Sequence, residues 1–206
     1  MTSDHMTTCK FAGERFFRFY HSHCVSPDDD TLFSLLNAIH SMNDKLQKAT
    51  SDNFFECHEF IVLKTLRNLF HHEAELINEV RSISVASLPI STDLMFLCLV
   101  PGSLVFQSIE RLDKKRRVQE EAIIRSTLKW YGNVVNINPC IFNFTVHVFE
   151  KLRSHGVKPE GIEYTNFEAS YLFEEDIDQS HFVTGDISCL VGSVEEVLTA
   201  LFADVT

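Results

Sequence analysis

The sequence predicts an all-α protein: a helical bundle built on a long antiparallel helix hairpin, followed by a less regular acidic C-terminal segment. Three observations lead to this prediction. The 206 residues include only 7 Gly and 5 Pro, so breaks between elements are few. Apolar residues recur at three- and four-residue spacing over long stretches before residue 157. The apolar and charged fractions, 45% and 23%, are ordinary for a globular chain.

Charge divides the chain near residue 156. Residues 157–206 contain eleven acidic residues and one basic residue, whereas residues 1–156 carry a net charge of only −1. We therefore expect a helical domain at 1–156 and an acidic extension at 157–206 that is able to pack on the same core. The total charge of −11 does not argue against nucleic-acid binding by the larger part.

Two predicted helices form the hairpin. The first spans residues 31–49, after the capping signal at residues 26–30, and its apolar residues follow a helical period. The second spans residues 51–83 and begins at a second capping signal. Its apolar stripe consists of Phe55, Val62, Leu66, Leu69, Leu76, Ile77 and Val80. Consecutive helices joined by a short loop pack antiparallel.

The other segments are less regular. Aromatic residues before position 25 predict a short helix. Residues 93–100 fit either a buried helix or a strand, and the helix is favoured. We further expect a long helix at 103–131, a helix at 140–154 started by Asn138 and Pro139, a short strand or irregular loops at 161–182, and a final short helix after Gly192.

The cysteines indicate a reducing compartment. Six of them are scattered along the chain with no CxxC pair, and the N-terminus lacks the apolar run of a signal peptide, so we expect a cytoplasmic protein. The longest apolar run, residues 94–106, is shorter than the roughly 20 residues of a membrane span. No membrane association is therefore expected.

Two clusters invite other chemistry. His21, His23 and Cys24 resemble metal ligands but lack a partner pair at a known spacing, so we expect no metal and no cofactor. Cys57 beside His58 suggests a thiol nucleophile. Adjacent residues on a helix point in different directions, however, and the position of Cys57 near the apolar stripe favours a place in the core.

One polar cluster lies on the predicted outer side of the second helix. The run Arg67-Asn68-Leu69-Phe70-His71-His72 resembles the R-x4-6-H motif of the HEPN superfamily, in which a polar residue, often Asn, follows the Arg. The helical architecture of residues 26–156 resembles that of the superfamily, whereas the motif itself consists of only the six residues 67–72. It implies a metal-independent endoribonuclease of a toxin–antitoxin, abortive-infection or CRISPR system.

The resemblance also implies roles for these side chains. Arg67 would bind the scissile phosphate, His72 would transfer protons, and Asn68 would orient them; this suits the permanent charge of Arg and the near-neutral pKa of His. On an ideal helix Arg67 and His72 lie about 140° apart, so they do not meet within one chain. The resemblance therefore implies a site shared across a homodimer. His71, about 40° from Arg67, is the rival histidine.

Partners follow from the same interpretation. RNA is the expected substrate, an antitoxin protein is a possible partner, and the basic run Lys114, Lys115, Arg116 and Arg117 is a candidate RNA-backbone site. Four consecutive bases cannot share one helix face, and a solvated helix is the simpler explanation of that run. The alternative function is a non-catalytic interaction protein whose acidic C-terminal segment binds a basic partner.

Overall fold

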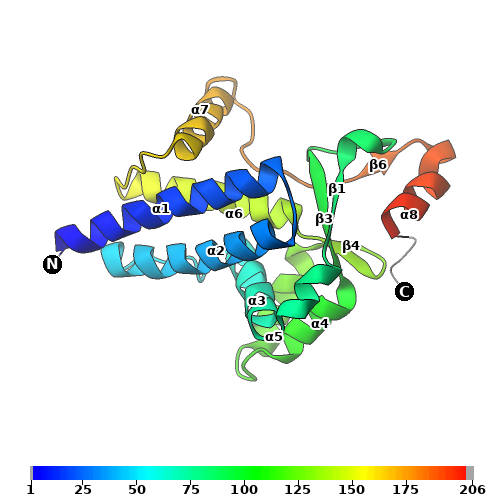
Figure 1. Ribbon diagram of the computed structural model, residues 1–206, viewed down its shortest axis with the longest axis horizontal. Coiled ribbons are helices and arrows are strands. Elements are labelled where there is room, and N and C mark those ends of the chain that lie inside the picture. The colour runs from blue at the N-terminus through cyan, green and yellow to red at the C-terminus, as the bar shows by residue number, and fades with distance from the viewer. Residues whose placement is uncertain (1, 203–206) are drawn as a thin grey trace.

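A computed structural model describes residues 2–202. Two long helices, α1 (Thr2–Val25) and α2 (Asp29–Thr50), lie antiparallel and side by side (Figure 1). Asp28 caps α2, because its carboxylate accepts a hydrogen bond from the Thr31 amide at 2.7 Å while the Thr31 hydroxyl binds the Asp28 amide. Ser51, in the left-handed conformation with φ of 66°, ends α2. The predicted capping signal at Ser51 is thus the end of a helix.

The predicted helix at 51–83 is much shorter in the structure. Helix α3 spans His58–His72 and is followed by a 3-10 segment, η1 (Ala74–Glu79). Glu73 breaks the helix with φ of −137°, and its carboxylate forms an ion pair with Arg111 of the next helical region. Ile77 lies in η1 and Val80 directly follows it, and both side chains are buried although neither residue belongs to α3. Their helical spacing therefore did not indicate a continuation of the helix. The long hairpin expected between 31–49 and 51–83 does not form; the long antiparallel pair is α1 and α2.

A small sheet follows, against the all-helical prediction. Strands β1 (Arg81–Ser84), β3 (Phe96–Pro101), β5 (Val134–Asn136) and β4 (Lys129–Tyr131) form an antiparallel sheet in the order β1-β3-β5-β4. A second pair joins β2 (Ile90–Ser91) to β6 (Ser188–Cys189), and η2 (Val85–Ser87) lies between β1 and β2. The helix favoured at 93–100 was wrong. β3 is buried on both faces, and such a strand has the same continuous apolar run as a buried helix.

The helix predicted at 103–131 is also divided. Helix α4 (Gly102–Glu110) and helix α5 (Arg117–Thr127) are separated by a turn at residues 111–116, and β4 follows α5. Asp113 stabilises the turn, since its carboxylate accepts a hydrogen bond from the Lys115 amide at 2.8 Å. The basic run therefore lies in a turn and at the first residue of α5, and not in the middle of a helix.

The C-terminal third contains more helix than expected. Helix α6 (Asn138–Ser154) agrees with its prediction, and so does α8 (Val194–Phe202), which follows η3 (Val191–Ser193). Residues 161–182, predicted as a strand or loops, instead contain helix α7 (Ile162–Asp176). Only Tyr164 and Tyr171 of α7 are buried, so its apolar pattern is too sparse to reveal a helix.

The core consists of two apolar clusters. The larger lies among α1, α2, α3, α6 and α7 and includes the edge-to-face ring pairs of Phe144 with Phe16 and with Phe54. The smaller joins the sheet to α8 through Leu97, Leu99 and Leu201. Both clusters contain residues from either side of position 156. The protein is therefore mainly helical with a small antiparallel sheet. None of the helices within residues 2–202 has the length and apolar character needed to cross a bilayer.

Candidate functional site

Helix α3 presents its polar residues away from the core. Leu63, Leu66 and Phe70 are fully or almost fully buried, because α3 packs against α2, α4, α5 and α6. The four motif residues lie on the remaining surface: Asn68, His71 and His72 are exposed, and Arg67 is half-buried. The rings of His71 and His72 lie 5.7 Å apart at an interplanar angle of 69°, so the two imidazoles face different directions.

Arg67 is directed toward α2. Its Nε donates a hydrogen bond to the side-chain oxygen of Asn37 at 3.1 Å, and its Nη1 donates to the side-chain oxygen of Asn68 at 3.3 Å. Asn37 is held in turn, since its amide donates to the Phe33 carbonyl at 2.9 Å. The motif Arg is thus positioned by an Asn from each of two helices. Asn37 comes from another helix, so the sequence pattern alone did not identify it.

Asn68 and His72 are directed toward α4. One turn apart on α3, they line a cavity of about 350 Å³ whose other wall includes Ser108 and Arg111. His71 is not among the lining residues. Of the two adjacent histidines, His72 is therefore the one that shares a cavity with a second motif residue and a guanidinium group. Arg67 and His72 do not meet in this chain, because Arg67 binds α2 and His72 faces α4.

A second cavity, of about 170 Å³, continues from the first along the same helices. Lys64, Asn68, Arg111 and Arg116 line it, so Asn68 and Arg111 belong to both cavities. Carboxylates hold the two guanidinium groups: Arg111 pairs with Glu73, and Arg116 lies 3.6 Å from Glu120. Asp113 and Glu120 also line the second cavity, so its three basic residues are largely balanced by carboxylates. The guanidinium groups could bind a phosphate only by exchanging these carboxylate partners for it.

The basic run is divided by its environment. Lys114 and Lys115 are exposed in the turn, and Arg116 lines the second cavity. Arg117 instead folds back, donating from Nη2 to the carbonyl oxygens of Glu110 and Leu112. Arg117 therefore ties α4 to α5, whereas the other three bases remain accessible to a ligand.

His40 is a neighbour of the motif that the sequence did not indicate. It lies on α2 near Arg67 and Lys64, and its Nδ1 is 3.5 Å from the Asp44 carboxylate. Burial lowers the pKa of His40, Asp44 acts against this shift, and the charges of Arg67 and Lys64 lower the pKa further.

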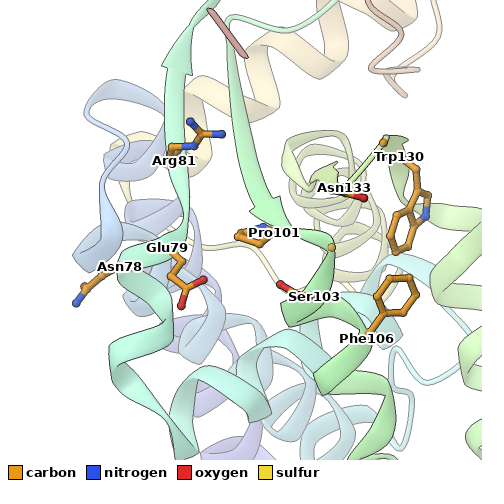
Figure 2. Close-up of a pocket in the computed structure, with 10 residues that line it drawn as sticks. Asn78, Glu79, Arg81, Pro101, Ser103, Phe106, Trp130 and Asn133 are labelled. Carbon is orange, nitrogen blue, oxygen red and sulfur yellow. The ribbon is translucent and has the colours of Figure 1, made fainter. Parts of the chain in front are cut away.

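A cavity larger than these two lies elsewhere, between η1, the start of α4 and the turn between β4 and β5. Its volume is about 670 Å³. Figure 2 shows Phe106 and Trp130 side by side on one wall, with ring centroids 5.4 Å apart, and Glu79 and Arg81 across from them. Arg81 already donates to the Leu201 carbonyl at 3.1 Å. The cavity thus combines an aromatic wall with a carboxylate and a guanidinium group, and no motif residue lines it.

The other clusters singled out in the sequence do not converge. His21 and Cys24 are exposed, whereas His23 is fully buried with its Nδ1 3.1 Å from the Thr31 hydroxyl. Cys57 is half-buried and packs against the main core, while His58 is exposed. A comparison of the chain with known protein families, curated proteins and solved structures finds no match.

Proposed function

We propose that this protein is a HEPN-like endoribonuclease that needs no metal for cleavage and forms its site across a homodimer. One observation carries the proposal: Asn68 and His72 of the motif line a cavity together with Arg111, next to a second cavity with Lys64 and Arg116. An exposed histidine beside a guanidinium group offers a proton-transfer group and a positive charge, which are the components that phosphodiester cleavage requires. The six-residue motif supplies the family resemblance.

The chemistry can be assigned to named side chains. The ribose 2′-oxygen attacks the neighbouring phosphorus, the bond to the 5′-oxygen breaks, and a cyclic phosphate and a 5′-hydroxyl result. His72 transfers protons to or from these oxygens, and the guanidinium of Arg67 stabilises the charge that develops on the phosphate. Asn68 accepts a hydrogen bond from Arg67 of its own chain and so positions that guanidinium group.

A second chain completes the site. Arg67 of one chain would meet His72 of the other, since within one chain these side chains face α2 and α4 respectively. A two-fold symmetric dimer would create two equivalent sites. RNA would then run along the turn between α4 and α5, where Lys114, Lys115 and Arg116 contact its backbone. A cytoplasmic location and a cognate antitoxin protein belong to the same proposal.

RNA cleavage in the presence of EDTA tests this function. Purified protein is incubated with total RNA, alongside Arg67→Ala and His72→Ala. We expect cleavage by the unmodified chain and a loss of at least ~100-fold in rate in both variants, because each removes a group that acts on the reacting atoms. The His71→Ala variant tests the role of the rival histidine, and we expect it to keep most of the RNA-cleaving activity.

Two matched controls accompany these variants. His58→Ala removes an exposed histidine from the other end of α3, and Arg18→Ala removes an exposed arginine from α1. Both should cleave RNA at the rate of the unmodified protein. Intact RNA in every lane, or equal losses in the controls and the motif variants, would refute the proposed nuclease.

A second candidate is a non-catalytic interaction protein that binds a basic partner through its acidic segment. The end of α7 favours it: Leu172, Phe173 and Ile177 are exposed among Glu175 and Asp176. Apolar side chains surrounded by acids suit a partner with basic and apolar residues. The same assay separates the candidates, since the interaction protein leaves RNA intact.

A further inference from the structure

Three side chains with metal-binding atoms lie together where the start of α3 meets the middle of α6. They are Cys57, Glu59 and His147, and their ligand atoms all lie within 4.8 Å of one another. Glu59 is the central member: its Oε2 is 3.2 Å from the Cys57 Sγ and 3.5 Å from the His147 Nε2. Cys57 and Glu59 flank the first residue of α3, whereas His147 comes from the middle of α6.

These separations suit a tetrahedral zinc site. With Zn–S near 2.3 Å and Zn–N and Zn–O near 2.1 Å, neighbouring ligand atoms of a tetrahedron are about 3.4–3.6 Å apart. The two distances from Glu59 Oε2 lie within a few tenths of an ångström of that range. One thiolate, one imidazole and one carboxylate form a ligand set that favours Zn²⁺ over Mg²⁺ or Ca²⁺. Three protein ligands leave the fourth position for water.

The surroundings orient the histidine. Its second nitrogen, Nδ1, lies 3.8 Å from the Glu150 carboxylate, and Glu150 accepts a hydrogen bond from the Tyr171 hydroxyl at 3.1 Å. The separation between Nδ1 and the Glu150 carboxylate is longer than a hydrogen bond, so in the metal-free chain Glu150 acts on the imidazole through its charge. A carboxylate near the distal nitrogen is a common companion of a zinc-bound histidine. The Phe182 ring, with its centroid 5.0 Å from that of His147, packs against the imidazole.

We propose that Cys57, Glu59 and His147 bind one divalent transition metal ion of the zinc class, with Glu150 positioning His147. Binding releases the thiol proton of Cys57 to solvent and forms a metal–sulfur bond. The ion would join the start of α3 to α6. Along the axis of α3, Arg67 lies about 12 Å and His72 about 20 Å from Glu59, so the ion does not reach the proposed cleavage site.

Cobalt titration of the full chain, without an affinity tag and with a non-thiol reductant, tests this site. Co²⁺ is a spectroscopic substitute for Zn²⁺, and a thiolate ligand gives it an intense near-ultraviolet absorption. We expect this absorption to saturate at one ion per chain and to be displaced by Zn²⁺. Cys57→Ser should abolish it, and His147→Gln should weaken binding by at least ~100-fold. Glu150→Gln should weaken binding by about 10–100-fold.

Cys189→Ser is the matched control, since Cys189 is another half-buried free thiol, located in β6. It should leave the titration unchanged, and circular dichroism of each metal-free variant checks that it is folded. Absence of the thiolate absorption in the unmodified chain would overturn the proposal. So would its persistence in Cys57→Ser or undiminished binding in His147→Gln. The measurement uses the protein alone, so it is independent of RNA cleavage.

Discussion

At the scale of single residues, His23 illustrates how burial controls a charge. Its ring is fully buried, packs edge-to-face against Phe96 at 5.4 Å, and binds the Thr31 hydroxyl through Nδ1. Its Nε2 is buried without a hydrogen-bond partner. Burial lowers the pKa of His23 to about 4, against the opposing effect of Asp28. The folded protein therefore contains this histidine in its neutral form at neutral pH.

This arrangement predicts a pH dependence of stability. The unfolded chain binds a proton at His23 near pH 6.5, whereas the folded chain resists it until about pH 4. The free energy of unfolding should therefore fall as the pH decreases from about 6.5 to about 4. The contribution of His23 is up to ~3 kcal/mol, because each pKa unit corresponds to about 1.4 kcal/mol. Urea unfolding at a series of pH values measures it.

The pH dependence of the free energy of unfolding must be compared between variants, because Asp and Glu carboxylates also titrate in the lower part of this pH range. His23→Gln should flatten the dependence, and His21→Gln, which replaces an exposed histidine on the same helix, should not. If the free energy of unfolding fell with decreasing pH as steeply in His23→Gln as in the unmodified protein, burial of His23 would not be the cause of the pH dependence.

The sequence was informative about which motif residues face outward, and uninformative about their partners. The apolar stripe through Leu66 and Leu69 correctly left Arg67, Asn68 and the two histidines on the outer surface of α3. The partners Asn37, His40 and Arg111 come from α2 and from the end of α4. Helical spacing contains no information about such contacts, because they depend on how the helices pack.

At the scale of elements, the segment before β6 is attached to the body by a close backbone approach. Gly185 has φ of 68°, and its amide donates to the Asp93 carboxylate at 2.9 Å. Its carbonyl accepts a hydrogen bond from Tyr131 at 3.1 Å. A Cβ atom added at Gly185 would lie 2.1 Å from Cγ of Pro139, at the start of α6. Only glycine satisfies both the backbone conformation and the available space.

Gly185→Ala should therefore destabilise the protein by about 3 kcal/mol or more, since it adds a steric clash to the cost of a left-handed residue. Gly132→Ala is the matched control, because Gly132 has φ of 63° but its added Cβ would contact nothing within 4 Å. That variant should lose only about 1 kcal/mol. Chemical denaturation measures the free energy of unfolding of both variants. An equal loss of stability in the two would show that the contact with Pro139 adds no cost at Gly185.

The elements also explain where sequence interpretation failed. The periodic residues Ile77 and Val80 continue the pattern of α3 into η1, so the pattern alone could not locate the end of the helix. Residues 96–101 pair with β1 and β5 on either side, and this pairing depends on strands that are distant in sequence. By contrast, α6 was predictable, because Pro139 and Gly156 delimit a strongly apolar, periodic segment.

At the scale of the whole molecule, the acidic segment and the candidate site lie apart. Figure 1 places α7 on the far side of α1 from α3 and α5, and α8 beside the sheet at the other end of the molecule. Several acidic side chains of this segment form ion pairs with residues that precede it, as Glu175 does with Arg153 and Glu160 with Lys10. The residues that line the two cavities beside α3 come from the region between Phe55 and Glu120. An RNA strand would thus approach a face distant from α7.

The central claim is that two chains share each catalytic site. Subunit mixing tests it most directly. Arg67→Ala and His72→Ala, each inactive alone, are combined in equal amounts under conditions that allow subunit exchange, and light scattering confirms that dimers form. In a mixed dimer one site carries both substitutions and the other carries neither. Half of the dimers are mixed, so RNA cleavage should recover to about a quarter of the unmodified rate. A monomeric protein, or a mixture as inactive as its components, would contradict the shared site.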